Sequence, residues 1–281
     1  MRPPFFHLRD THMNIHYSIG DIHGRLDLLQ AAQGMIRRDA KKNGYSDCVI
    51  VYLGDYIDRG PQSPQVLDHL INKPMNGFTE IALRGNHEDM LLDCLVPGLI
   101  GQHEQREMFL TYGGIPTLLS YGNTYLTQKN DDTKNNVFSV NPDNWNWEQI
   151  EYSIPSSHID FLESLSYKYD TGEHFYTHAG ARNIGAVDDP MFQDNNVYSW
   201  IRGLERYKGS YKAMDGKHRT LVHGHCPTKD GKAFVSDHRI NLDNGAVHTG
   251  SQAVGVLGED AGPRVFYTPV FPRPPLDKSK V

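Results

Sequence analysis

Cysteine, basic charge and long apolar runs are all scarce in this chain of 281 residues, and each scarcity excludes a class of protein. The three cysteines are widely spaced and form no Cys-x-x-Cys pair, so we expect neither a disulfide framework nor a zinc–thiolate site. Lysine and arginine number 28 against 34 aspartates and glutamates, giving a net charge of −6. That balance argues against nucleic acid as a partner, because such a partner needs a basic face.

Membrane association and secretion are not expected either. The longest apolar run near a predicted strand, Cys48–Leu53, is far too short to cross a bilayer. The first residues, Met1–His7, lack the apolar stretch and the small-residue cleavage site of a signal peptide. The sequence therefore predicts an acidic globular protein of the reducing cytoplasm, with no membrane partner and a core large enough for an enzyme.

Apolar β-rich runs alternate with helical patterns, which predicts an α/β fold. Helices are expected around Leu28–Ile36 with a stop at Lys41–Gly44, after Pro64, and from His87 to about Val96. The expected strands are Ile15–Ile19, Cys48–Leu53, Glu80–Leu83, Phe175–Thr177, Thr220–Val222, Ala233–Val235, Ile240–Leu242, Val254–Leu257 and Val265–Tyr267.

One domain is expected over residues 14–270. It carries an irregular, asparagine-rich insertion at about 121–150, in which Trp145 and Trp147 are expected to act as anchors. The tail Phe271–Val281, rich in proline and lysine, is expected to fray.

Each of the five leading strands is followed by side chains that commonly bind metal ions. The segments are Gly20-Asp21-Ile22-His23-Gly24, Gly54-Asp55-Tyr56-Ile57-Asp58-Arg59-Gly60, Arg84-Gly85-Asn86-His87-Glu88, His178-Ala179-Gly180 and His223-Gly224-His225. Because the carboxyl ends of strands in an open α/β sheet converge on one crevice, we expect these loops to meet in space. Asp21 and His23 project to the same side of an extended chain and can bind one ion together.

The chemistry of these side chains predicts a site for divalent metal ions. A mixture of Asp, His and Asn without thiolates suits Mn²⁺, Fe or Zn²⁺ better than Ca²⁺. The candidates are too many for one tetrahedral ion and about right for two ions that share a bridging ligand. Two such ions outweigh the carboxylates, and Arg59 and Arg84 add further positive charge. A small, compact dianion such as phosphate fits a pocket of this charge.

These motifs resemble the metallophosphoesterase superfamily, and GDYIDRG with RGNHE is similar in particular to the short bacterial phosphoprotein phosphatases. The resemblance extends from about Asn14 to Gly255, with GDIHG, GDYIDRG, RGNHE, THAG and the late GH in the family's order. It implies a four-layer α/β/β/α sandwich of two mixed sheets. It also implies two divalent ions at one edge, with Mn²⁺ the first expectation and Fe or Zn²⁺ the alternatives.

The resemblance also implies roles for single residues. Asp21 and His23 would hold the first ion, Asp55 would bridge both ions, and Asn86, His178 and His225 would hold the second. His225 is preferred to His223, because Gly224-His225-Cys226-Pro227 matches the family's Gly-His-Thr-Pro. In the family, a hydroxide that bridges the ions attacks phosphorus in line, with no phosphoenzyme.

Other matched residues are implied to act on the substrate. His87 would be the general acid, oriented by the Asp58 carboxylate. Arg59, Arg84 and Arg202 would bind the phosphate oxygens. Glu88 is expected either to support the ligands from behind or to lie at the start of the helix that follows His87, and it is not expected to bind an ion.

The implied activity is that of a metal-dependent phosphomonoesterase for phosphoproteins and phosphopeptides. Phosphoserine and phosphothreonine are the first expected substrates, and phosphotyrosine is a further one. The alternative is a dinucleoside polyphosphate hydrolase of the diadenosine tetraphosphate type, which shares the metal motifs. The symmetric tetraphosphatases lack the second Asp of GDxxDRG and the Arg before GNH, so Asp58 and Arg84 favour the protein phosphatases. A catalytically inactive binding protein would have lost a ligand, and every one is present.

Overall fold

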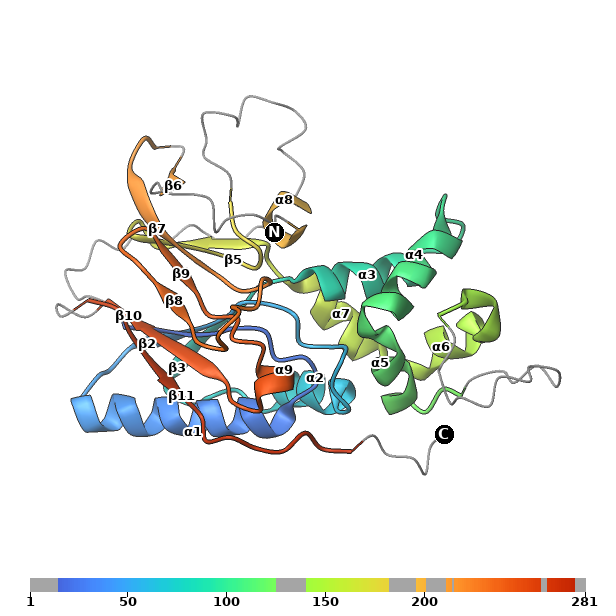
Figure 1. Ribbon diagram of the computed structural model, residues 1–281, viewed down its shortest axis with the longest axis horizontal. Coiled ribbons are helices and arrows are strands. Elements are labelled where there is room, and N and C mark those ends of the chain that lie inside the picture. Colours follow the sequence, from blue (N-terminus) through green and yellow to red (C-terminus); the bar gives the residue numbers. More distant parts are fainter. Residues whose placement is uncertain are drawn as a thin grey trace.

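The computed structural model describes residues 15–124, 140–181, 196–200, 211–213, 215–258 and 262–275. Its strands form two mixed sheets, with helices on their outer sides and at one end (Figure 1). The helices described are α1 (Leu26–Asn43), α2 (Ser63–Asn72), α3 (Asn86–Leu95), α4 (Gln102–Phe109), α5 (Ile115–Ser120), α6 (Trp147–Ser153), α7 (Ser156–Ser164), α8 (Asn196–Trp200) and α9 (Ala246–Thr249). None of these described helices is long and apolar enough to cross a membrane.

The first sheet has the order β11-β10-β1-β2-β3. Its strands are β1 (His16–Ile19), β2 (Cys48–Tyr52), β3 (Phe78–Ala82), β10 (Ala253–Leu257) and β11 (Arg264–Tyr267). The strands β1, β2 and β3 are parallel, whereas β10 runs antiparallel to β1 and to β11. The parallel strands therefore end at the same edge, which is where their loops begin.

The second sheet has the order β4-β5-β7-β9-β8, and β6 pairs with β7. Its strands are β4 (Lys168–Asp170), β5 (His174–Thr177), β6 (Tyr211–Lys212), β7 (His218–His223), β8 (Phe234–Val235) and β9 (Arg239–Asn241). The strands β5, β7 and β9 are parallel to one another. Two mixed sheets were expected from the resemblance, and this expectation is confirmed.

Side-chain alternation along β2 explains why the two sheets stack. Val49 and Val51 belong to a buried cluster that also contains Tyr176 and Val222 of the second sheet. Ile50 and its neighbours on the other face pack into the larger core beneath α1 and α2. A strand buried on both faces is apolar at nearly every position, as Cys48–Tyr52 is. On the outer face of the second sheet, Tyr198 of α8 packs against a small cluster around Phe175.

The helix α1 follows its sequence pattern closely. Leu28, Leu29, Ala32 and Ile36 lie on its buried face. The helix ends at Gly44, whose φ of 69° is a left-handed conformation that glycine adopts without steric cost. The predicted first helix and its stop are therefore confirmed, as are the helices predicted after Pro64 and His87, which are α2 and α3.

The predicted strands are confirmed with small shifts at their ends. The largest shifts are two residues: β3 begins at Phe78 before the predicted Glu80, and β7 begins at His218 before the predicted Thr220. Phe78 pairs with Cys48 at the start of β2, so pairing with the partner strand extends β3 back to the end of the Asn76-Gly77 turn.

Helices α3 to α7 gather at one end of the sheets (Figure 1). Part of the asparagine-rich segment, residues 125–139, lies outside the described residues. Downstream of it, Trp145 and Trp147 are buried, and the Trp147 ring lies 4.5 Å from the guanidinium of Arg106 on α4. Trp147 Nε1 also donates to the carbonyl of Pro142 at 2.9 Å. These contacts attach the end of the segment to α4.

Candidate active site and metal centre

The loops that follow β1 and β2 are joined by their backbones at the edge of the first sheet. The backbone amides of Ile22 and His23 donate to the carbonyl of Asp55 at 3.0 and 2.8 Å. A side chain at Gly60 or Gly24 would collide with the opposite backbone, so both glycines are needed for this close approach. The contact brings Asp21 and His23 beside Asp55.

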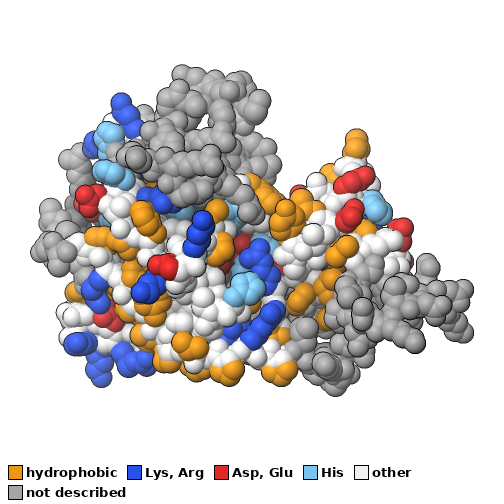
Figure 2. Space-filling model, in the orientation of Figure 1, with side chains coloured by type: hydrophobic (Ala, Val, Ile, Leu, Met, Phe, Trp, Pro, Cys, Tyr) orange, Lys and Arg blue, Asp and Glu red, His pale blue; other side chains and the backbone are white. Residues whose placement is uncertain are grey.

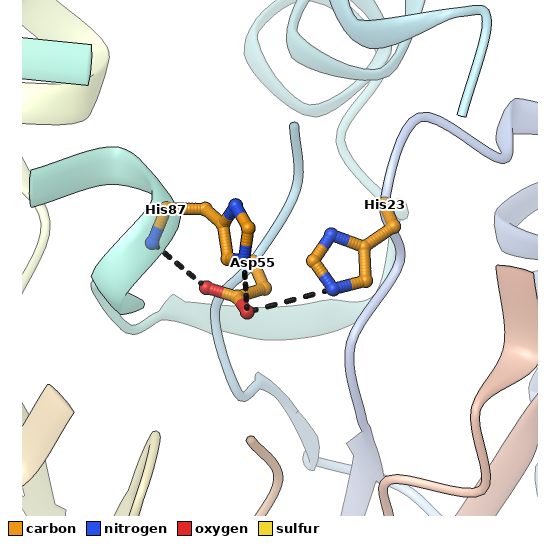
Figure 3. A group of neighbouring side chains, drawn as sticks. All are labelled: His23, Asp55 and His87. Atoms are coloured by element: carbon orange, nitrogen blue, oxygen red, sulfur yellow. Dashed lines mark hydrogen bonds and ion pairs between the residues drawn. The ribbon is translucent and has the colours of Figure 1, made fainter. Parts of the chain in front are cut away.

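The first group of candidate ligands surrounds one oxygen of Asp55. Asp55 Oδ2 lies 3.6 Å from His23 Nε2 and 3.8 Å from His87 Nε2. Figure 3 shows the two imidazoles on either side of this carboxylate. Asp21 Oδ2 lies 3.9 Å from His23 Nε2, so Asp21 belongs to the same group.

The second group surrounds the other oxygen of Asp55 and the Asn86 amide. His178 Nε2 lies 3.3 Å from Asp55 Oδ1 and 3.1 Å from Asn86 Oδ1. His225 Nδ1 lies 2.8 Å from Asn86 Oδ1. Candidate atoms of Asp55, His178 and His225 all lie within 4.8 Å of one another, as do those of His23, Asp55 and His87. Asp55 is thus common to both groups.

Backbone carbonyls orient two of the histidines. His23 Nδ1 lies 2.8 Å from the carbonyl oxygen of Ile57, and His178 Nδ1 lies 2.8 Å from that of Leu53. A ring nitrogen that donates to a carbonyl leaves the other nitrogen to face the cluster with its lone pair, which is a common arrangement for metal ligands. His223, by contrast, directs Nδ1 at the Gly224 carbonyl and is absent from both groups.

The geometry and charges of these groups fit divalent cations. Asp21 Oδ2 is buried and has no hydrogen-bond partner among the residues that the structure describes. Burial, together with Asp243 and Asp55, raises the pKa of Asp21 well above its usual range, so a nearby cation would stabilise the carboxylate. Oxygen and imidazole ligands without thiolate suit Mn²⁺, Fe or Zn²⁺.

Asp55 and His178 form a strongly interacting pair. Burial alone would raise the pKa of Asp55, but His178 and His87 outweigh it and hold this pKa well below its usual range. Burial likewise opposes a charge on His178, whereas Asp55 and Asp21 raise the pKa of His178 to about 10. His178 must give up its proton to become a ligand, so cation binding at this group would release a proton.

His87 and Asp58 form a buried pair beside the first group. His87 Nδ1 lies 2.7 Å from Asp58 Oδ2, and both side chains are fully buried. The other carboxylate oxygen of Asp58 accepts from Thr117 Oγ1 at 2.7 Å. The position of the Asp58 carboxylate is therefore fixed from two sides, and His87 presents Nε2 toward Asp55.

Of the three arginines expected to bind phosphate, only Arg59 is seen to reach the candidate ligands. Its guanidinium nitrogens lie 2.6 Å from His23 Nε2 and 2.8 Å from His87 Nε2. Arg84 instead donates to the carbonyls of Leu162 and Glu163 at 2.7 and 2.8 Å. Arg202 lies outside the described residues.

Glu88 connects two of the ligand loops. It is fully buried in the first turn of α3, and its carboxylate accepts from the amides of Gly85, Asp55 and Tyr56 at 2.8, 2.9 and 2.8 Å. Burial and Asp55 raise the pKa of Glu88 to about 7. Glu88 thus lies at the start of this helix, as expected, and its contacts also fix the backbone of Asp55.

Asp243 is a site residue that the sequence analysis missed. It is buried, and burial together with Asp55 raises its pKa to about 6, although the Gly245 amide opposes this shift. Asp243 follows β9, so a polar residue at the carboxyl end of a further parallel strand was the signal available in the sequence.

Backbone strain concentrates at the site. Six non-glycine residues among those described have a positive φ, and five of them are candidate site residues: His23, Asp55, Asp58, Arg59 and His225. Residues other than glycine rarely adopt this conformation, and it is found disproportionately at functional sites.

Comparison with known proteins agrees with this arrangement. The model of the calcineurin-like phosphoesterases matches residues 17–255. Serine/threonine-protein phosphatase 2 of Escherichia coli K12 is 36% identical over 96 residues, which make up 34% of this chain and 37% of that protein. The match thus spans well under half of the relative's length.

Two solved structures show the same fold at low identity. A protein assigned as a diadenosine tetraphosphatase shares 18% identity, with a TM-score of 0.53 over 93% of this chain and 96% of the other. The cold-active protein-tyrosine phosphatase of a psychrophilic Shewanella species shares 13% identity, with a TM-score of 0.51 over 90% of this chain and 80% of the other. With most of its length matched by the family model and its ligand motifs gathered at one edge of the sheets, the chain belongs to the calcineurin-like phosphoesterases, the metallophosphoesterase family that its motifs resemble.

Proposed function

We propose that this protein is a metal-dependent phosphomonoesterase that acts on phosphoserine and phosphothreonine in proteins, with phosphotyrosine as a further substrate. The observation that carries the proposal is Asp55 at the centre of two ligand groups, with the buried His87–Asp58 pair beside them. The Ser/Thr preference is supported by the bacterial phosphatase relative and by the presence of Asp58 and Arg84 in the motifs.

The proposed ligands divide between the two groups. Asp21, His23 and Asp55 would hold one ion, and Asp55, Asn86, His178 and His225 the other. Mn²⁺ is the proposed ion, with Fe or Zn²⁺ as alternatives. Two divalent ions held here would supply a nucleophile from water at neutral pH and stabilise the attacking and leaving oxygens.

The protein's own residues position the ester and provide a proton. The Arg59 guanidinium lies against His23 and His87. This position supports the proposal that Arg59 binds phosphate oxygens at the edge of the first group. The leaving alkoxide of serine is strongly basic and needs a proton as the P–O bond breaks. His87 is proposed to donate that proton from Nε2, while Asp58 holds the ring through Nδ1 and stabilises its charged form.

Arg84 and Arg202 complete the proposed phosphate-binding set. Arg84 would have to exchange the carbonyls of Leu162 and Glu163 for phosphate oxygens. Cytoplasmic location is also proposed, because Cys48, Cys94 and Cys226 form no disulfide within the described part of the chain.

Hydrolysis of dinucleoside polyphosphates is the second candidate function. The structural similarity to the protein assigned as a diadenosine tetraphosphatase, which covers nearly the whole of both chains, is the observation that favours it. Both candidates use the same ligand groups, so the substrate distinguishes them.

Metal removal and substrate comparison test the proposal together. The chelator-treated protein should be inactive, and activity toward a phosphoserine peptide should return with Mn²⁺ more than with Zn²⁺ or Fe. A phosphotyrosine peptide and diadenosine tetraphosphate are measured in parallel at equal concentration. Full activity after metal removal would contradict the metal-dependent mechanism. Turnover of the dinucleotide alone would replace the first candidate by the second.

A further inference from the structure

After β11 the chain returns beneath α9 as a short segment, residues 268–275, which we call the C-terminal strap (Figure 1). Thr268 begins it with a backbone hydrogen bond to the carbonyl of Gln252 at 3.0 Å. Phe271 donates to the carbonyl of Gly250 at 2.7 Å. The first residues of the predicted frayed tail are therefore attached to the end of α9, and residues 276–281 lie outside the described residues.

The strap is also held by Arg25, close to the ligand loop that contains Asp21 and His23. Arg25 is fully buried and binds the Asp27 carboxylate through two hydrogen bonds of 2.9 and 2.8 Å. Its Nη2 also reaches the carbonyl oxygens of Phe271 and Pro272 at 3.3 and 3.4 Å. A buried guanidinium thus connects the strap to the start of α1.

Arg273 extends from this strap to the site. Prolines at 272, 274 and 275 restrict the backbone on both sides of it, so little conformational freedom remains to be lost on binding. The Arg273 guanidinium donates to the backbone carbonyl of Arg59. The side chain of Arg59 in turn contacts His23 and His87. Arg273 therefore lies next to the proposed phosphate-binding residue.

Positive charge accumulates at this rim. Among the described residues, no carboxylate forms an ion pair with Arg59 or Arg273. Burial lowers the pKa of His248 on α9, and the positive charges of Arg273 and Arg59 lower it further. Near the centre of this face, Figure 2 shows blue Lys or Arg side chains and a pale-blue His, with red Asp or Glu side chains close by.

We propose that Arg273 forms a rim subsite for a second anionic group of the substrate. That group is either a carboxylate near the phosphorylated residue of a protein or a further phosphate of a dinucleoside polyphosphate. A guanidinium recognises both through paired hydrogen bonds. The proposal rests on the proposed phosphoesterase activity and specifies its substrates. Arg273 lies beyond residues 17–255, so the segment shared with the family does not include it.

The test compares Arg273→Gln with wild type on two phosphoserine peptides that differ only in flanking Asp or Asn residues. Glutamine retains a donor for the Arg59 carbonyl and removes the charge. The ratio of kcat/KM for the acidic peptide over the neutral peptide should fall about 3- to 5-fold, as expected for an exposed charge pair. The fall should shrink at high salt. Arg38→Gln, which removes an exposed arginine on α1, should leave the ratio unchanged.

Two further measurements separate the outcomes. Diadenosine tetraphosphate is included, and a loss confined to it would identify phosphate as the second anion. Fluorescence anisotropy measures the binding of both peptides to the Mn²⁺-loaded protein, which gives the acidic-to-neutral ratio of affinities without turnover. Failure of the wild type to hydrolyse any phosphate ester would contradict the proposed function alone. An acidic-to-neutral ratio that Arg273→Gln leaves unchanged in binding, with no selective loss for the dinucleotide, would overturn the subsite.

Discussion

His87 Nδ1 and Asp58 Oδ2 lie 2.7 Å apart, with both side chains shielded completely from solvent. Thr117 occupies the second oxygen of Asp58, so the carboxylate is fixed in relation to the imidazole. A carboxylate that accepts from one ring nitrogen stabilises a proton on the other. This relationship suits a general acid whose other nitrogen, Nε2, faces the candidate metal ligands and contacts Arg59.

His87→Asn should slow substrates in the order of how strongly their leaving groups need a proton. Phosphoserine turnover should fall by about 10²- to 10⁴-fold, the usual contribution of general acid catalysis. Turnover of phosphotyrosine should fall less, because its leaving phenol has a pKa of about 10, and turnover of nitrophenyl phosphate should fall least. Asp58→Asn should give the same order with smaller effects. Equal losses on all three substrates, with metal content unchanged, would show that His87 only positions the phosphate.

Asp55→Asn should remove more metal than His23→Ala. Asp55 directs one oxygen at each ligand group, whereas His23 belongs to one group only. Elemental analysis after equilibration with Mn²⁺ should find loss from both sites in the first variant and mainly one in the second, and activity should follow. The same partial loss in both variants would argue against Asp55 as the shared ligand.

Arg59→Ala should mainly weaken phosphate binding, whereas Arg84→Ala should mainly lower the stability of the fold. Losing Arg59 should weaken competitive inhibition by inorganic phosphate about tenfold or more, since hydrogen bonds to charged groups contribute roughly 1.5–3 kcal/mol each. Arg84→Ala leaves the Leu162 and Glu163 carbonyls without their donor, so it should lower the free energy of unfolding by about 1–3 kcal/mol. Phosphate inhibition and urea denaturation, measured on both variants, decide between these effects. Arg84→Ala should raise the phosphate inhibition constant less than Arg59→Ala, because Arg84 must first give up the Leu162 and Glu163 carbonyls to reach phosphate. Equal increases in both variants would contradict this order.

Asp39 should contribute stability that disappears in acid. Burial would raise its pKa, but Arg264 and Tyr17 outweigh burial and lower it. A lowered pKa in the folded state means that the contribution is complete above the unfolded value of about 3.9 and is lost as the pH falls through the folded value. Asp39→Asn should therefore cost about 1 kcal/mol at pH 7 and almost nothing near pH 2. Urea denaturation at both pH values is the measurement. An equal loss of stability at both would show that the Asp39 charge is not its cause.

The ligand loops could be predicted because each signal is local. An apolar strand followed by Gly-Asp or Gly-Asn-His can be recognised from a few consecutive residues. Parallel pairing of β1 with β2 and of β2 with β3 then brings three such strand ends together. The second sheet was not visible in the residue pattern and came from the family resemblance. Its strands β4 and β6, which were not among the expected strands, have only three and two residues, too few to give a period.

Contacts made by tertiary packing were not predictable in the same way. Arg84 stands directly before a ligand loop, yet its side chain turns to α7, which is about 80 residues away in sequence. Likewise, a proline-rich tail gives no local reason for Arg273 to reach Arg59. In both cases the acceptor is a backbone carbonyl. Every residue type carries one, so the sequence does not indicate which carbonyl will be the partner.

The concentration of positive φ angles at His23, Asp55, Asp58, Arg59 and His225 has a consequence for protein engineering. Each such residue costs the fold on the order of 1 kcal/mol or more, and glycine would relieve that cost. A library selected for thermal stability alone should therefore enrich glycine or asparagine at these positions. The most heat-resistant clones would be the inactive ones, so directed evolution of this enzyme needs an activity screen in every round.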